Sequence, residues 1–382
     1  MIRLSKRAQK IPPFIVMDVL ERAHDLERQG RHIIHLEVGE PDFQTPECIC
    51  KAGSGAIEDG DTHYTHSQGT LEFREAVCEH YQKKYGVLFN PEQVIATSGT
   101  SPALFMIISA LLDPGDEIII SDPAYPCYPN FVEFIGAKPV FVEVHEEDGF
   151  QLRPEEIRKK VGPKTRAIIV NSPSNPTGNL LSSDRMKEIA DLGIPVISDE
   201  IYHGLVYGET EHSILEFTED AFVINGFSKL YAMTGWRLGY IIATKDFVRP
   251  LQKIQQNFFV SAGSISQKAG IAALTQAEAN VKEMIKTYDE RRRYMIQRVR
   301  ELGFGLSTDP AGAFYMLLNA RHLSASSYDL AFEILEKAGV GVTPGIDFGK
   351  NAEGYIRLSY ANSLENIKEG LNRIEEFLEA RK

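Results

Sequence analysis

The amino-acid sequence of 382 residues predicts an α/β protein with two domains. Seven short runs of β-branched and other apolar residues alternate with segments of helical length through the middle of the chain. From about residue 245 the pattern changes to long helices with a few short strands among them. We therefore expect a large domain with a mostly parallel seven-stranded sheet between helices, and a smaller α+β domain built from both termini.

The strands are the best-marked elements of the large domain. Several of the runs are apolar without alternation, as strands covered on both faces must be. Helical patterns fall between most of them; residues 182–193, for example, begin with a serine N-cap and end with a glycine. Strands joined in this way favour a parallel sheet. We expect the strands at residues 94–97, 117–121, 138–144, 166–170, 195–199, 221–225 and 238–243.

The smaller domain is expected to combine both ends of the chain. Residues 14–30 form an amphipathic helical pattern that lies outside the main alternation of strands and helices. Towards the C-terminus come a long charged helix at 281–303, another helix at 327–338 and a closing helix, with strands within 312–319 and 354–360. The expected division is an N-terminal segment at 1–45 that joins the small domain, a large domain at 46–285 and a small domain at 286–382.

The charge and the apolar runs disfavour two classes of partner. There are 53 acidic and 41 basic residues, which gives a formal net charge of −12. Because such a surface repels phosphate backbones and anionic membranes, we expect neither nucleic-acid nor membrane binding. The N-terminus lacks the apolar region of a secretory signal. The longest strongly apolar run, residues 103–112, is too short for a membrane span and predicts a buried helix.

The cysteines indicate a reducing compartment. Four cysteines are too few for a disulfide framework in a chain of this length. Cys48 and Cys50 form a C-x-C pair, but no second Cys/His cluster lies nearby in the sequence, so we expect no metal site. A cytoplasmic location is the resulting expectation.

Polar side chains follow several of the predicted strands, where an open α/β sheet binds its ligands. Asp199 ends an apolar strand and Tyr202 lies three residues on, while Asn175 follows another strand in a loop rich in proline and glycine. The turn at 99–101 joins a strand to an apolar helix, and N–H groups at a helix N-terminus suit a phosphate. Each feature alone also suits an ordinary turn. Together they predict a ligand site at this edge of the sheet.

One lysine has unusual surroundings. In "NGFSKLYAMTGWRLGY", residues 225–240, Lys229 follows Ser228, has several small neighbours and precedes Arg237 by eight positions. An exposed lysine needs no such setting. A buried lysine near other cations has a lowered pKa, which makes its amine available as a nucleophile and a base.

In this order and spacing, these residues resemble the class I/II pyridoxal-phosphate-dependent aminotransferases, which have the aspartate aminotransferase fold, type I. The resemblance covers nearly the whole chain and implies the pyridoxal-phosphate transferase fold with pyridoxal 5'-phosphate as cofactor. Its blocks are "GEPDF" (39–43), "YTHSQGTLEFREAV" (64–77), "DPAYPCYP" (122–129), "SNPTG" (174–178), "DEIY" (199–202), "FSKLYAMTGWRLG" (227–239), "PAGAFY" (310–315), "TPGIDFG" (343–349) and "YIRLSY" (355–360).

The resemblance implies a role for each residue around the cofactor ring. Lys229 would hold the cofactor aldehyde as a Schiff base and, once freed by the substrate amine, carry the proton of the substrate α-carbon. Asp199 would face the pyridine nitrogen and keep it protonated, so that the ring accepts electrons. Tyr202 and Asn175 would hydrogen-bond the 3' oxygen of the ring, and Tyr125 would stack on its face.

The phosphate and the substrate also have matching residues in the family. Tyr64 would reach the phosphate from the neighbouring subunit, which implies a homodimer with a shared active site. Arg357 would bind the α-carboxylate of the substrate bidentately, beside Asn175, and the backbone at Gly39 would lie against the substrate. The phosphate ligands of the same chain would be Thr100, Ser101, Ser228 and Arg237, with Gly99 allowing the turn.

The implied function is an amino-acid aminotransferase, which transfers an α-amino group from an L-amino acid to a 2-oxo acid in a ping-pong cycle. Two alternatives are a pyridoxal-phosphate-dependent carbon–sulfur β-lyase and a non-enzymatic cofactor-binding regulatory module; the acidic composition opposes the second. The donor stays open among aromatic, alanine-like and branched-chain amino acids. Ser101 stands where some prokaryotic relatives carry a lysine, which weakens a strict aspartate assignment without excluding it.

Overall fold

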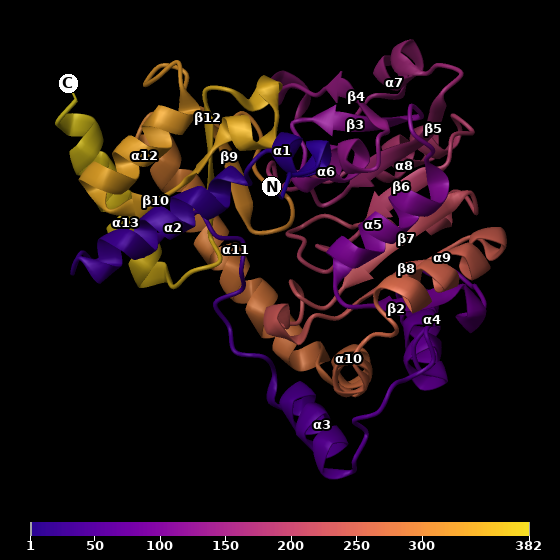
Figure 1. Cartoon of the computed structure of the whole chain (residues 1–382). Helices are drawn as coiled ribbons and strands as arrows, with labels where there is room; N and C mark the ends of the chain where they lie inside the picture. The colour runs from indigo at the N-terminus through magenta and orange to yellow at the C-terminus, as the bar shows by residue number, and fades with distance from the viewer. Residues whose placement is uncertain (1, 382) are drawn as a thin grey trace.

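The computed structural model describes residues 2–381 and has a seven-stranded sheet between helices, which lies in the right half of Figure 1. The strand order is β2-β8-β7-β6-β5-β3-β4. β8 pairs in antiparallel with β2 and β7, and the other neighbours pair in parallel. The expected fold is therefore confirmed, and every expected strand is present. The bounds are β2 (Val94–Thr97), β3 (Glu117–Asp122), β4 (Lys138–Glu143), β5 (Thr165–Asn171), β6 (Val196–Asp199), β7 (Ala221–Gly226) and β8 (Gly239–Ile242).

Helices cover both faces of this sheet because its central strands are apolar on both. In β7, Phe222 and Ile224 pack in one hydrophobic core with α5, α6 and α9, whereas Ala221 and Val223 pack in another with α4, α8 and α10. The run expected to be a buried helix lies in α5. The bounds are α3 (Glu47–Glu58), α4 (Leu71–Tyr85), α5 (Thr100–Leu111), α6 (Cys127–Phe134), α7 (Pro154–Lys160), α8 (Ser183–Ala190), α9 (Lys245–Phe258) and α10 (Ser264–Gln276).

A second group of elements contains both ends of the chain. A three-stranded antiparallel sheet has the order β11-β12-β9, and β1 pairs in parallel with β10, so that Ile34 lies opposite Val340. α2 lies beside α12, as Figure 1 shows at the left of the molecule. The bounds are α2 (Ile15–Arg28), β1 (Ile34–His35), α11 (Glu278–Glu301), β9 (Tyr315–Asn319), α12 (Ser327–Ala338), β10 (Val340–Gly341), β11 (Thr343–Pro344), β12 (Tyr355–Ser359) and α13 (Leu364–Glu379).

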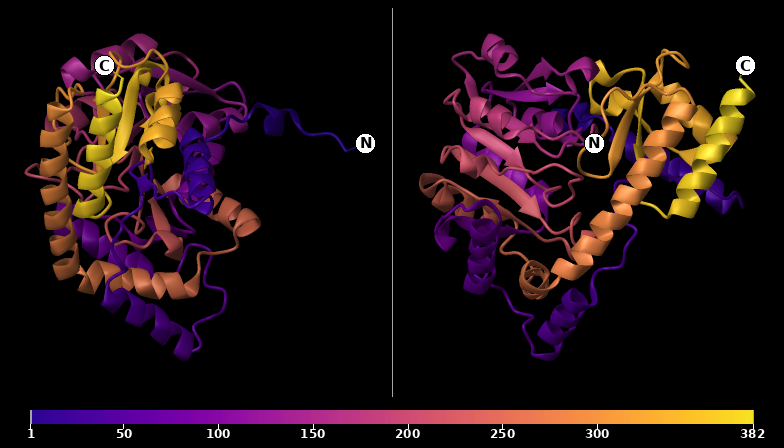
Figure 2. Two further views of the ribbon diagram at one scale, coloured as in Figure 1. Left: turned by 90° about the vertical axis from the view of Figure 1, so that its left-hand side faces the viewer. Right: turned by 180° about the vertical axis from the view of Figure 1, so that it is seen from behind.

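The long helix α11 connects the two groups of elements. Figure 2 shows it as one continuous helix that extends from the neighbourhood of α10 towards the small sheet. The expected boundary between residues 285 and 286 falls inside this helix, so the division into domains stays a proposal. The described residues before the short helix α1 (Lys6–Lys10) extend away from the rest of the chain in the left view of Figure 2, whereas the guanidinium carbon of Arg7 in α1 lies 5.8 Å from the centre of the Phe134 ring in α6. No helix within residues 2–381 is both long enough and apolar enough to cross a membrane.

The carboxyl ends of the central strands meet at one edge of the large sheet. Asn171 at the end of β5 lies opposite Asp199 at the end of β6, and Asp199 lies opposite Ile224 in β7. The loops that leave these strands contain Asn175, Tyr202 and Lys229. Because parallel strands end at the same edge, residues far apart in the sequence come together there.

Candidate active site

A pocket opens at this edge of the large sheet, between the sheet and the second group of elements. Its wall includes residues from α2, from the segment just after β1, from α5 and α6, from the strand-end loops and from β9 and β12. The expected site residues that line it are Gly39, Thr100, Ser101, Tyr125, Asn175, Asp199, Tyr202, Lys229 and Arg357. The structure therefore brings most of the expected site together.

Lys229 lies in the turn that follows β7, and its side chain is partly buried in the pocket. Its Nζ donates a hydrogen bond of 2.6 Å to the carbonyl of Gly39. Burial lowers the pKa of Lys229 to about 8; the positive charges of Arg357 and Arg237 also lower it, while Glu40 opposes them. A substantial fraction of this amine is therefore neutral near physiological pH, as a nucleophile or base requires.

Asp199 is the acidic group of the pocket, and its side chain is buried. One carboxylate oxygen accepts a hydrogen bond of 2.7 Å from the hydroxyl of Tyr128, and the other accepts one of 3.2 Å from the backbone N–H of Ile201. Desolvation raises the pKa of Asp199 to about 6, against the effect of these two donors and of Lys229. A cationic partner in the pocket would stabilise the ionised form.

Two tyrosines and a glycine shape the pocket around Lys229. The hydroxyl groups of Tyr202 and Tyr315 lie 2.9 Å apart, and the two rings meet edge to face. A Cβ atom at Gly39 would lie 1.8 Å from the hydroxyl oxygen of Tyr315. Only glycine can therefore bring the backbone this close, which is the position at which its carbonyl accepts from Lys229.

Arg357 is a buried cation held by neutral acceptors. One guanidinium nitrogen donates to Asn175 Oδ1 at 2.8 Å, and the other donates to the carbonyl of Glu37 and, at 3.1 Å, to Thr343 Oγ1. Its guanidinium carbon lies 4.3 Å from the centre of the Tyr315 ring. Among residues 2–381, its Nε has no hydrogen-bond partner. The charge is therefore fixed in orientation but not neutralised by a carboxylate hydrogen bond, which leaves it suited to an anionic ligand.

Four of the expected phosphate residues, Gly99, Thr100, Ser101 and Arg237, lie around the N-terminus of α5. Gly99 precedes α5 with a φ of +96°, a conformation that favours glycine. A Cβ atom at this position would lie 2.5 Å from a terminal nitrogen of Arg237, so the guanidinium packs directly over the glycine. Thr100 and Ser101 begin the helix and line the pocket, whereas Gly99, Ser228 and Arg237 are outside the described lining.

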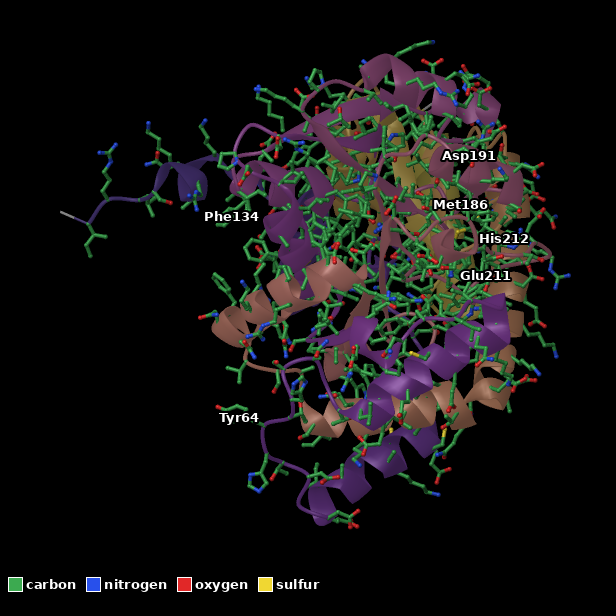
Figure 3. All side chains as sticks on the ribbon, turned by 90° about the vertical axis from the view of Figure 1, so that its right-hand side faces the viewer. Tyr64, Phe134, Met186, Asp191, Glu211 and His212 are labelled. Atoms are coloured by element: carbon green, nitrogen blue, oxygen red, sulfur yellow. The ribbon has the colours of Figure 1, made fainter. Side chains whose placement is uncertain are left out.

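Tyr64 is outside the pocket of its own chain. It lies between α3 and α4, and 86% of its side chain is exposed. Figure 3 shows it projecting from the ribbon into the surroundings. Within one chain it therefore does not take part in the site, and its expected role depends on a second subunit.

Several residues that shape the site were not singled out in the sequence. Tyr128 donates a hydrogen bond to the carboxylate of Asp199, and Tyr315 shares a hydrogen bond with Tyr202. The side-chain amide of Asn171 donates a hydrogen bond of 2.9 Å to the backbone carbonyl of Asp199. Tyr128 and Tyr315 stand inside two of the blocks that carry the resemblance, "DPAYPCYP" and "PAGAFY". These blocks could therefore have indicated that Tyr128 and Tyr315 belong to the site. Nothing in the sequence indicated that the carbonyls of Gly39 and Glu37 would accept from Lys229 and Arg357.

The residues present fit pyridoxal phosphate. A lysine of lowered pKa, a buried carboxylate and a guanidinium packed over the helix-initiating glycine supply an amine for the aldehyde, an anion for the ring nitrogen and a cation for the phosphate. The Nε of Arg357 has no hydrogen-bond partner among residues 2–381, so this nitrogen remains as a donor for a substrate carboxylate. The donor set therefore suits both the cofactor and an amino-acid substrate.

Comparison with known proteins gives a consistent result. A model of the aminotransferase class I and II family matches residues 31–374. The chain is 45% identical over 380 residues to the (5-formylfuran-3-yl)methyl phosphate transaminase of Methanocaldococcus jannaschii, a match that covers 98% of this chain and 99% of that protein. It is 38% identical over 387 residues to an aspartate aminotransferase of Pyrococcus horikoshii, with coverage of 99% and 98%.

Solved structures of relatives share the whole fold. An aspartate aminotransferase of Thermus thermophilus with maleate has a TM-score of 0.94 at 37% identity, over 98% of this chain and 100% of that one. A crystal structure from Methanococcus jannaschii, described as similar in its active site to kynurenine aminotransferases, has a TM-score of 0.92 at 45% identity, over 98% and 100%. The chain therefore belongs to the class I and II aminotransferases, and it is a pyridoxal-phosphate-dependent transaminase.

Proposed function

We propose that this transaminase transfers the α-amino group of an L-amino acid to a 2-oxo acid in a ping-pong cycle, with Lys229 as the catalytic amine. The observation that carries the proposal is the position of this lysine. It lines one pocket with the carboxylate of Asp199 and the guanidinium of Arg357, and its pKa is lowered to about 8. The pocket thereby combines an amine for covalent bonding and proton transfer with an anion that can bind the cofactor and a cation that can bind the substrate.

Pyridoxal phosphate, when bound, supplies an aldehyde for the amino group and an electron-accepting ring. Asp199 would hold a proton on the ring nitrogen, because its buried carboxylate gains an ionic partner there. Lys229 Nζ would bond the aldehyde carbon in the resting enzyme and afterwards move the proton of the substrate α-carbon. Tyr202 and Asn175 would donate hydrogen bonds to the ring oxygen, and Tyr125 would lie against the ring.

The remaining expected residues divide between phosphate and substrate. Arg357 would bind the α-carboxylate, which supplies the acceptor that its Nε lacks among the described residues. Gly39 would bring the backbone against the substrate. The phosphate would lie at the N-terminus of α5, where the backbone N–H groups and Arg237 are available. Its ligands would be Thr100, Ser101, Ser228 and Arg237, with Gly99 permitting the turn.

A homodimer with a shared active site completes the proposal. Tyr64 is exposed in its own chain and would bind the phosphate in the partner's site. We also propose a cytoplasmic location, supported by four free cysteines, Cys48, Cys50, Cys78 and Cys127.

The decisive experiment is replacement of Lys229. In Lys229→Ala, transamination of an amino acid with 2-oxoglutarate should fall by about 10³-fold or more, because the base and the covalent link are both lost. Borohydride should trap the cofactor on position 229 in the wild type and not in the variant. Lys253→Ala, which removes an exposed lysine of α9, serves as the matched control. Near-wild-type turnover in Lys229→Ala would contradict the assignment.

The same assay separates transamination from carbon–sulfur β-elimination. Formation of glutamate from 2-oxoglutarate, at the expense of the donor, supports the proposed function. Release of pyruvate and ammonia from a cysteine conjugate, without a new amino acid, would instead support the lyase.

A further inference from the structure

We propose that the amino donor of this site carries an aromatic side chain, an inference that rests on the proposed transamination. The basis is the chemistry of the pocket wall that remains after the catalytic groups are assigned. Phe14, Val16, Met17 and Leu20 line the pocket from the start of α2, and all four are apolar. Leu104 of α5 and Phe131 of α6 line it as well.

The functional groups leave this wall to the donor's side chain. Arg357 would hold the α-carboxylate and Lys229 would act at the α-carbon, so a side chain must meet other parts of the lining. Among the described lining residues, Lys229 and Arg357 are the only ones with a basic lysine or arginine side chain. A second carboxylate, as in aspartate, would therefore lose its hydration against apolar atoms, and no cation of the described lining is left to compensate for that loss.

Aromatic edges in the wall favour a ring over an aliphatic side chain. The ring of Phe14 meets the ring of Tyr125 edge to face, with centres 6.0 Å apart and planes at 87°. Phe131 supplies another ring to the same lining. Aromatic pairs of this kind gain free energy beyond the burial of their area. Met17 is 45% exposed while it lines the pocket, so a flexible thioether lies where it can adapt to a flat ring.

The wall is held in place by a residue far along the chain. Asp347 accepts hydrogen bonds from the backbone N–H groups of Ile15, at 3.0 Å, and Val16, at 3.2 Å. These are the first residues of α2, so the carboxylate satisfies N–H groups that the helix itself leaves free. The apolar wall is thereby positioned over the pocket before any substrate binds.

The inference is tested with a donor panel on the holoenzyme. The value of kcat/KM for phenylalanine or tyrosine should exceed that for aspartate by about 100-fold and that for leucine by about 10-fold. A preference for aspartate or leucine over both aromatic donors would overturn the inference while the proposed function stands. If no amino acid donates to any 2-oxo acid, the proposed function itself fails.

A binding measurement keeps the inference testable without turnover. Calorimetry on the holoenzyme should show tighter binding of 3-phenylpropionate than of succinate, both of which lack an amino group. The reverse order would overturn it.

The variant Met17→Arg places a cation in the wall and should reduce the ratio of phenylalanine to aspartate activity by about 10-fold or more. Its matched control is Glu21→Arg, which adds the same side chain at an exposed position of α2 outside the described lining. An unchanged ratio in Met17→Arg, or an equal change in both variants, would contradict the assignment of this wall.

Discussion

Two carboxylates that are neighbours in the sequence, Asp199 and Glu200, have opposite surroundings. Asp199 is the last residue of β6 and Glu200 follows it. Both side chains are buried, with an exposed fraction of 8% for Asp199 and 0% for Glu200. Asp199 lines the pocket and has two hydrogen-bond donors. Glu200 is outside the described pocket lining and has four hydrogen-bond donors, three of which donate to the same carboxylate oxygen. Burial raises the pKa of Asp199 to about 6 and that of Glu200 to about 7.

Under the proposed function, the end of one strand would serve binding through Asp199 and structure through Glu200. Glu200 accepts from Ser198 Oγ at 3.1 Å, Ser213 Oγ at 2.9 Å, the backbone N–H of Ile214 at 3.1 Å and the hydroxyl of Tyr81 at 2.9 Å. It joins β6 to α4 and to the segment before β7. Asp199 keeps acceptor capacity that faces the pocket. Burial alone therefore does not distinguish the two carboxylates; what distinguishes them is that Asp199 lines the pocket and Glu200 does not.

The largest expected effect is on activity, from Asp199→Ala. Transamination should fall by roughly 10³-fold, because the ring nitrogen would lose its anionic partner. The free energy of unfolding should fall by only about 1 kcal/mol, since two donors lose an acceptor. Steady-state kinetics and urea unfolding measure the two quantities. Asp220→Ala, at an exposed carboxylate, is the control. A variant that keeps its activity would remove the distinction between the two carboxylates.

The next effect is on stability, from Glu200→Ala. The free energy of unfolding should fall by about 4 kcal/mol, because buried donors lose their acceptor and a cavity remains. Glu200→Gln, which keeps the volume and one carbonyl acceptor, should lose about half as much. Urea unfolding of both variants checks this order. A stable Glu200→Ala protein with impaired chemistry would mean that Glu200 acts in the site.

A third carboxylate, Glu37, has a cationic partner and gives a smaller, pH-dependent effect. His35 Nδ1 lies 2.7 Å from Glu37 Oε1, and this hydrogen bond, with help from Glu27, raises the pKa of His35 to about 9. The folded protein therefore holds a proton that the unfolded chain releases near pH 6.5, so the stabilisation is complete below 6.5 and is lost as the pH rises through about 9.

The variant His35→Gln isolates this contribution. At pH 6 it should be less stable than the wild type by about 2 kcal/mol, and the difference should nearly vanish at pH 10. Urea unfolding at the two pH values measures it. A difference that does not depend on pH would show that His35 stabilises the fold by packing alone.

The smallest expected effect is a change in the pKa of Lys229, which distinguishes Asp199 from Glu200. In the apoprotein, the rate of labelling of Lys229 by a small amine reagent, followed by mass spectrometry, should have its midpoint near pH 8. Asp199→Ala should lower this midpoint by a few tenths of a pH unit, since the negative charge of Asp199 raises the pKa of Lys229. Glu200→Gln should leave it unchanged. Equal shifts in both variants would show that the two carboxylates act on the lysine alike.

The sequence contained most of the fold because hydrophobic runs record burial directly. All seven expected strands of the large sheet are present, with ends that differ by one residue at most. The reversed direction of β8 was not predicted, since an apolar run has no direction. The small strands β1 and β10 were also missed, because two residues form no periodic pattern.

The site was predictable where residues follow strands, and less so where distant segments meet. Lys229, Asp199 and Asn175 stand at strand ends, and the resemblance supplied their expected roles. The wall from Phe14 to Leu20 was expected as a helix, but amphipathicity identifies a buried face without showing what it faces. Tyr64 lies outside the pocket of its own chain, and the role that the resemblance implies for it requires a neighbouring subunit.

The parallel pairing of Ile34 with Val340 has a consequence for protein synthesis. The two carbonyls that face Lys229 and Arg357 belong to Gly39 and Glu37, just after β1. During synthesis on the ribosome, β1 cannot pair until β10 has been translated, 306 residues later. At ordinary elongation rates this interval is roughly 15 to 60 s. The nascent chain therefore cannot complete the pocket around Lys229 and Arg357 until translation is almost finished, and a chain released early lacks the completed pocket.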